Sequence, residues 1–221
     1  MIELKNISKT FKSKNENIEV LKNISFRAPS NKISLIYGHS GVGKSTLLSI
    51  MGTLMCPTSG EVIFNNKIID YNSDLSYLRR DSIGFVFQDN YLLPEYNILE
   101  NLIVPQLING KSFFKSKMKS LEMLAMVDLK YLSSRYYNEV SGGEKQRISL
   151  IRSLINDPLI VIADEPTANL DENNCKLLLE LIVKLNNELG KTFIIATHDI
   201  RFKSLTNSIF KLFNGELVKD A

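Results

Sequence analysis

Residues 38 to 46 read GHSGVGKST, and no other stretch of the chain restricts the fold as strongly. They contain the pattern G-x-x-x-x-G-K-S between two short apolar runs, over residues 33–37 and 47–51. We interpret these runs as a buried strand and the start of a helix. In such a strand–loop–helix, backbone N–H groups curl around an anion and the helix N-terminus adds partial positive charge. The flanking pattern disfavours the alternative, a glycine-rich turn that happens to precede a helix.

The loop therefore predicts a site for a nucleoside triphosphate. Lys44 is expected to reach the β- and γ-phosphates, and the Ser45 hydroxyl to bind Mg²⁺. The pattern identifies neither the base nor the use of the energy. The residues expected to bind the nucleotide here are Gly38, His39, Ser40, Gly41, Val42, Gly43, Lys44, Ser45 and Thr46.

The composition is that of an ordinary globular domain. The chain has 221 residues, of which 44% are hydrophobic and 23% charged. A net charge of +3 is too small to predict nucleic-acid binding, but it is compatible with a position near an anionic membrane surface. Cys56 and Cys175 show neither metal-ligand spacing nor a disulfide framework, so we expect a reducing compartment. No apolar run reaches the roughly 20 residues that span a bilayer, so a role at a membrane would need a separate partner chain.

Three further apolar runs, interpreted as buried strands, end in polar side chains: Gln88, the pair Asp164 and Glu165, and His198. Taken singly, these are most simply a solvated strand end, an acidic turn and a structural histidine. Three such strand ends together favour one shared site opposite the phosphate loop. There Asp164 can hold Mg²⁺, usually through water, and Glu165 can orient the attacking water or accept its proton.

The character of the sequence changes over residues 89–157, where apolar residues recur at helical spacing. We expect a helical insert, with a helix over 97–107 and a basic, polar connection over 110–120. Near its end, Ser141-Gly142-Gly143 precedes a long helical pattern and predicts an exposed helix N-terminus. The alternative is an ordinary helix start capped by Ser141.

The remaining segments complete an α/β pattern. Phe11 sits beside a predicted polar turn, and spacing alone does not decide whether it is a core aromatic at a strand end or stacks on a nucleotide base. The other predicted elements are strands within residues 1–27 around a turn over 12–17, a helix over 75–82, an amphipathic helix over 172–189 stopped by Gly190, and a closing hairpin over 208–218 around Asn214-Gly215.

We therefore expect one domain over residues 1–221. A nucleotide-binding core over 1–88 and 158–221 would contain a mostly parallel sheet and an antiparallel β subdomain built largely from the N-terminal region. The helical subdomain over 89–157 would be inserted into this core.

In order along nearly the whole chain, these motifs resemble those of the ATP-binding cassette (ABC) ATPase family. GHSGVGKST resembles its Walker A loop, and VSGGEKQR its signature, which other phosphate-loop proteins lack. LIVIADEP resembles its Walker B strand with the catalytic Glu165, and ANLD its D-loop. Gln88 resembles the Q-loop glutamine and His198 the switch histidine, while Phe11 falls where the family carries its adenine-stacking aromatic.

The resemblance implies a P-loop NTPase fold with a RecA-like core, ATP and Mg²⁺ as cofactors, and Gln88, Glu165 and His198 as catalytic residues. The metal would be bound by Ser45, Gln88 and Asp164. The family works as a head-to-tail homodimer with two ATP molecules at the interface. In it, Ser141, Gly142 and Gly143 of one copy would cap the γ-phosphate held by Lys44 of the other.

The resemblance also implies an integral membrane permease as partner, and a peripheral position on the cytoplasmic face of the inner membrane. LLPEYNILENLIVPQLI and ADEPTANLD look most similar to lipoprotein-releasing ATPases and their relatives. We therefore expect an ATPase that drives lipoprotein release. The alternatives are peptide or drug export, and a signalling role in cell division without cargo. His39 replaces a common Pro or Ser, and Ala168 a common Gly, without removal of a catalytic group.

A permease would be expected to dock in the groove beside Gln88, with residues 91–96 as the contact. The alternative is that these residues simply pack the insert onto the core.

Overall fold

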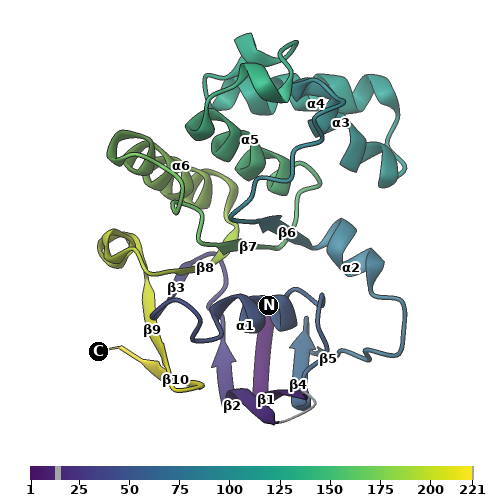
Figure 1. The fold of residues 1–221 in the computed structure, drawn as a ribbon. Coiled ribbons are helices and arrows are strands. Elements are labelled where there is room, and N and C mark those ends of the chain that lie inside the picture. Colours follow the sequence, from purple (N-terminus) through teal and green to yellow (C-terminus); the bar gives the residue numbers. More distant parts are fainter. Residues whose placement is uncertain (13–15, 221) are drawn as a thin grey trace.

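A computed structural model describes residues 1–12 and 16–220 (Figure 1). Within these residues, six strands form the central sheet in the order β10-β9-β3-β8-β7-β6. All pair in parallel except β10, which is antiparallel to β9. The strands are β3 (Ile33–Tyr37), β6 (Ile83–Val86), β7 (Ile160–Asp164), β8 (Thr192–Thr197), β9 (Ser208–Phe213) and β10 (Glu216–Lys219).

Both faces of the central sheet are buried, which explains the continuous apolar runs of its inner strands. Alternate residues of β7 point to opposite faces. Val161 and Ala163 pack in a core shared with the helical region, whereas Ile160 and Ile162 pack in a core shared with α1 and the second sheet.

The second sheet is antiparallel and comes from the N-terminal part of the chain, as predicted. Its order is β2-β1-β4-β5, and Figure 1 shows helix α1 between the two sheets. The predicted turn over 12–17 includes residues 13–15, which lie outside the described residues. The elements are β1 (Ile2–Lys12), β2 (Asn17–Arg27), α1 (Lys44–Met51), β4 (Ser59–Phe64), β5 (Lys67–Ile68) and α2 (Ser76–Asp81).

The helical region lies together on the far side of the central sheet from the antiparallel sheet (Figure 1). A capping box between Asn97 and Glu100 starts its first helix. The elements are α3 (Ile98–Ile108), α4 (Phe113–Met126), η1 (Lys130–Leu132), η2 (Tyr137–Glu139) and α5 (Gly142–Leu154).

The prediction of a connection over 110–120 is wrong, because α4 begins at Phe113 with Ser112 as its N-cap. The buried positions in the first two turns of α4 are Ser116 and Ser120. The buried Gln106 on α3 donates from Nε2 to the Ser120 hydroxyl (3.0 Å) and the Ser116 carbonyl (3.1 Å). This polar contact between helices leaves no apolar periodicity in the sequence.

The C-terminal part agrees with its prediction. Helix α6 (Glu172–Leu189) is capped by Asp171 and ends at Gly190, whose φ is 60°. The short helix η3 (Ile200–Leu205) leads into β9. Asn214 and Gly215 both have positive φ, 50° and 84°, as a tight hairpin turn requires. None of the helices in residues 1–12 and 16–220 combines the length and apolar character needed to cross a membrane.

Candidate active site

The loop from Gly38 to Thr46 joins the end of β3 to the start of α1. Gly43 is the N-cap of α1 and has a φ of 105°, a left-handed value that glycine adopts readily. A Cβ atom at this position would lie 2.7 Å from Cγ1 of Val20 on β2. The entry into α1 and its packing against β2 therefore both depend on glycine.

Lys44 is folded back over this loop and is only 5% exposed. Its Nζ atom donates to the carbonyl oxygens of Gly38 (2.8 Å) and His39 (3.0 Å). It also forms an ion pair with Oε1 of Glu165 at 3.1 Å. A buried ammonium group is tolerated because these three acceptors replace its water.

Glu165 follows β7 directly and has a φ of 45°, a left-handed conformation that costs a non-glycine residue about 1–3 kcal/mol. Its Oε2 accepts hydrogen bonds from the Thr197 hydroxyl (2.9 Å) and the backbone N–H of His198 (3.2 Å), and lies 2.9 Å from Nδ1 of His198. Burial raises the pKa of Glu165, but the contacts with His198, Thr197 and Lys44 outweigh it and hold the pKa below its ordinary value. Glu165 is therefore a carboxylate held by partners from the start of α1 and the end of β8.

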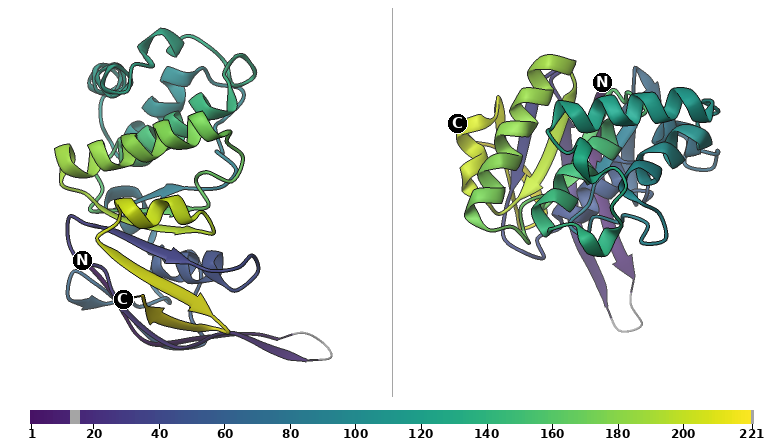
Figure 2. Two further views of the ribbon diagram at one scale, coloured as in Figure 1. Left: turned by 90° about the vertical axis from the view of Figure 1, so that its left-hand side faces the viewer. Right: turned by 90° about the horizontal axis from the view of Figure 1, so that it is seen from above.

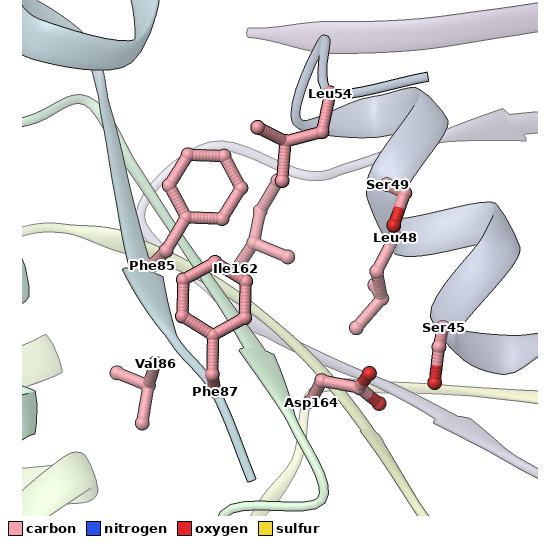
Figure 3. Close-up of a pocket in the computed structure, with 9 residues that line it drawn as sticks. All are labelled: Ser45, Leu48, Ser49, Leu54, Phe85, Val86, Phe87, Ile162 and Asp164. Atoms are coloured by element: carbon pink, nitrogen blue, oxygen red, sulfur yellow. The ribbon is translucent and has the colours of Figure 1, made fainter. Parts of the chain in front are cut away.

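Asp164, the last residue of β7, has the opposite character. Burial raises the pKa of its carboxyl group, and the neighbouring Glu165 charge raises it further. Its Oδ1 atom is buried without a hydrogen-bond partner in the described part of the chain. Figure 3 shows the Asp164 carboxylate and the Ser45 hydroxyl facing one another, with Phe85 and Phe87 beyond them.

This pair fits a small divalent cation, because Mg²⁺ takes oxygen ligands and keeps several waters or phosphate oxygens. The described residues contain no group of three His, Cys, Asp or Glu side chains that could hold a metal alone. A cation here would therefore share its ligands between the protein, water and a bound phosphate.

The ends of four parallel strands meet at one cavity of about 550 Å³. From the phosphate loop it takes Gly38, His39 and Ser40, and from the ends of β6, β7 and β8 come the predicted site residues. Its lining is Tyr37, Gly38, His39, Ser40, Gln88, Glu165, Ala168, His198 and Lys211. A cavity with a glycine-rich loop and these polar groups can hold a nucleotide phosphate beside a carboxylate.

Ser45 and Asp164 do not line this cavity but a second pocket, together with Phe85 and Phe87. Two more distant parts of the predicted site line neither pocket in the described chain. Ser141, Gly142 and Gly143 lie at the start of α5, where Ser141 and Glu144 form a capping box. Phe11 is the penultimate residue of β1, whose end projects from the molecule (Figure 2). Its side chain is 41% exposed, so the interpretation as a core aromatic is wrong.

Comparison with known proteins agrees with this geometry. Residues 21–168 match the sequence profile of the family described as ABC transporter. The chain belongs to the ABC transporter family. Two structures of one ATP-binding cassette, 38% identical to this chain, cover the whole chain with TM-scores of 0.90 and 0.91, and 98% of the chain in each structure is matched. One was solved as a dimer in a post-hydrolysis state bound to ADP and Pi, and the other is a dimeric bacterial ABC transporter cassette.

Two curated relatives carry the name lipoprotein-releasing system ATP-binding protein LolD. The protein from Buchnera aphidicola subsp. Schizaphis graminum is 42% identical over 214 residues, 96% of this chain and 93% of that protein. The protein from Bacteroides thetaiotaomicron is 40% identical over 222 residues and covers both chains completely. The fold is thus that of an ABC ATPase cassette of the α/β class, as predicted from the sequence.

Sequence reasoning missed two residues that position the ABC cassette's site. Thr197, fully buried at the end of β8, bonds Glu165 and also accepts from the backbone N–H of Asp199 (3.0 Å). Arg152 on α5 donates to the carbonyl oxygens of Asn90 (2.7 Å) and Tyr91, in the segment after Gln88. Thr197 ends an apolar run just before His198, which is a weak signal. No local pattern in the sequence points to Arg152.

Proposed function

We propose that this chain is the ATP-hydrolysing subunit of a complex that releases lipoproteins from a bacterial inner membrane through a separate permease. The observation that carries the proposal is the contact of Glu165 with both Lys44 and His198 beside a cavity of about 550 Å³ in an ABC cassette. The names of the curated relatives support lipoproteins as the cargo.

In this proposal the phosphate loop and the N-terminus of α1 bind the triphosphate, and Lys44 turns from Glu165 to the β- and γ-phosphates. This movement frees Oε1 of Glu165 to act as general base on water, while His198 and Gln88 orient the reacting groups. Ser45, Asp164 and Gln88 would hold Mg²⁺, which when bound would neutralise charge on the phosphates.

Catalysis is proposed to need a second copy of the chain. Because the start of α5 lies away from the cavity in one chain, Ser141, Gly142 and Gly143 would act on the nucleotide of the other copy. Phe11, exposed at the end of β1, would stack on adenine. ATP would join the two copies and hydrolysis would release them. The division into a core and a helical subdomain over 89–157 belongs to the same proposal.

The permease is proposed to dock beside Gln88 and to hold the chain at the cytoplasmic face of the membrane. Tyr91, Leu93 and Tyr96 are exposed, whereas Leu92 is buried. A groove of about 390 Å³ lies nearby, with Phe87, Ile108 and Arg152 among its lining residues. Exposed aromatic and apolar side chains beside an arginine are typical of an interface centre.

The test is ATP-dependent release of a lipoprotein from liposomes that contain the purified complex of this chain with its permease. Lys44→Ala should remove ATP binding, hydrolysis and release, because the phosphates lose their central cation. Lys176→Ala is the matched control, because this lysine is exposed on α6 and pairs with Glu180 at 4.0 Å. Hydrolysis with transport of a peptide or drug instead, or with no cargo moved, would contradict lipoprotein release.

A further inference from the structure

The adjacent glycines at the start of α5 have different surroundings. Gly142 is exposed, and a Cβ atom added there meets nothing within 4 Å in the described chain. Gly143 is buried, and a Cβ atom added there would lie 2.0 Å from Oδ1 and 2.3 Å from Cγ of Asn174. A side chain at 143 would therefore displace the Asn174 side chain, whereas a side chain at 142 would meet no atom of the described chain.

Asn174 lies in the first turn of α6 and forms hydrogen bonds with both Asp171 and Arg147. Its backbone N–H and its Nδ2 donate to the two carboxylate oxygens of Asp171, at 2.8 and 2.7 Å. Its Oδ1 accepts from Nη1 of Arg147 on α5 at 3.1 Å. One carboxamide thus joins the N-cap of α6 to the first turns of α5.

The same turn of α6 also holds the loop that leads to the nucleotide cavity. Cys175, buried beside Asn174, has its Sγ atom 3.8 Å from the Thr167 carbonyl oxygen and 3.6 Å from that of Leu170. Between them, Ala168 lines the cavity with Glu165 and His198. A continuous set of contacts therefore runs from the cavity through the start of α6 to Gly143.

We propose that Asn174 is a positioning residue that fixes the start of α5 against the loop over 168–171, so that both present one surface to the second copy. The proposal rests on the proposed function, in which the start of α5 acts on the partner's nucleotide. Asn174 touches no nucleotide itself. Its carboxamide occupies the space that a side chain at 143 would fill. Its hydrogen bonds to Asp171 and Arg147 fix the start of α5 relative to Asp171.

The test is a double-mutant cycle on the full chain, with Gly143→Ala, Asn174→Gly and their combination. Gly142→Ala, alone and with Asn174→Gly, is the matched control. Each variant is measured for kcat and KM of ATP hydrolysis and for free energy of unfolding in urea. Wild-type hydrolysis reports on the proposed function separately, because its absence would contradict that function whatever the cycle shows.

Asn174→Gly and Gly143→Ala should each lower kcat with little change in KM, because one removes the carboxamide and the other displaces it. The double variant should be no slower than Asn174→Gly alone, so that its loss is at least about fivefold smaller than the product of the single losses, the scale of coupling between contacting residues. Gly142→Ala and Asn174→Gly should have independent effects on kcat. If Gly143→Ala fails to fold, the double variant should fold and hydrolyse ATP. A wild-type kcat for Asn174→Gly, independent losses in kcat for the two substitutions, or coupling in unfolding free energy alone would overturn the positioning role.

Discussion

At the scale of single residues, the pKa values of two adjacent carboxyl groups are shifted in opposite directions. Glu165 has donors on both oxygens, which lower its pKa. Burial raises the pKa of Asp164, and its Oδ1 has no hydrogen-bond partner among the residues that the structure describes. An acceptor buried without a partner costs about 1–3 kcal/mol. This cost is explained if Oδ1 of Asp164 binds a ligand, because the contact with the ligand then replaces the hydrogen bond with water that is lost on folding.

This cost predicts that Asp164→Asn stabilises the nucleotide-free protein near neutral pH. The pKa of Asp164 is raised on folding from its ordinary value of 3.8. Well below pH 3.8 the carboxyl group is protonated in both the folded and the unfolded chain and has no effect on stability. As the pH rises above 3.8, ionisation favours the unfolded chain, and the loss of stability is complete above the raised pKa. The variant's advantage in Tm should therefore appear as pH rises from 4 and persist at pH 7.5. A gain of about 1 kcal/mol corresponds to about 2–4 °C in a chain of this size.

Asp74→Asn is the control, because a hydrogen bond from the Ser76 backbone lowers the pKa of Asp74. It should give no gain at pH 7.5. With Mg²⁺ and ATP the wild-type protein should have a higher Tm than Asp164→Asn, since only the wild-type protein would be stabilised fully by the ligand. A lower Tm for Asp164→Asn at pH 7.5 without nucleotide would contradict the assignment.

At the scale of elements, two helices clamp the segment that follows β6. Asn101 on α3 accepts from the Leu93 backbone N–H (2.7 Å) and donates to the carbonyl oxygens of Leu93 (3.0 Å) and Tyr96 (3.1 Å). Arg152 on α5 donates to the carbonyl of Asn90 in the same segment. A change at Gln88 would therefore be passed to both helices.

The exposed side chains of this clamped segment predict the effect of Leu93→Asp. A charge at the interface centre should abolish co-purification with the permease, while the purified chain still binds ATP with unchanged affinity. Ile68→Asp is the matched control, because Ile68 is 61% exposed on β5 in the antiparallel sheet. Retained co-purification of Leu93→Asp would place the docking surface elsewhere.

At the scale of the whole molecule, the fold follows from local patterns to a large extent. The doubly buried strands appear as apolar runs, and the phosphate loop and the Asn214-Gly215 turn have short local signatures. The first turns of α4 were not predictable, because their buried positions are serines matched to Gln106. The partners of Asn174 and Arg152 were not predictable either, because contacts between distant elements leave no periodicity.

The same limit applies to the site. The sequence places polar residues at the ends of strands, but the ion pair of Lys44 with Glu165 depends on how β7 and the loop meet in space. The backbone conformation of Glu165 likewise has no signature in the sequence, since glutamate rarely adopts positive φ. Which residues act on the partner's nucleotide depends on two copies together.

The most direct test of the account is the behaviour of Glu165→Gln. If Glu165 is the general base and ATP joins two copies, this variant should bind ATP, lose about 10²–10⁴-fold in turnover, and sediment as a dimer with ATP but as a monomer with ADP. The measurement is sedimentation velocity combined with steady-state hydrolysis on the same sample. Hydrolysis at the wild-type rate, or a monomer in saturating ATP, would contradict the account.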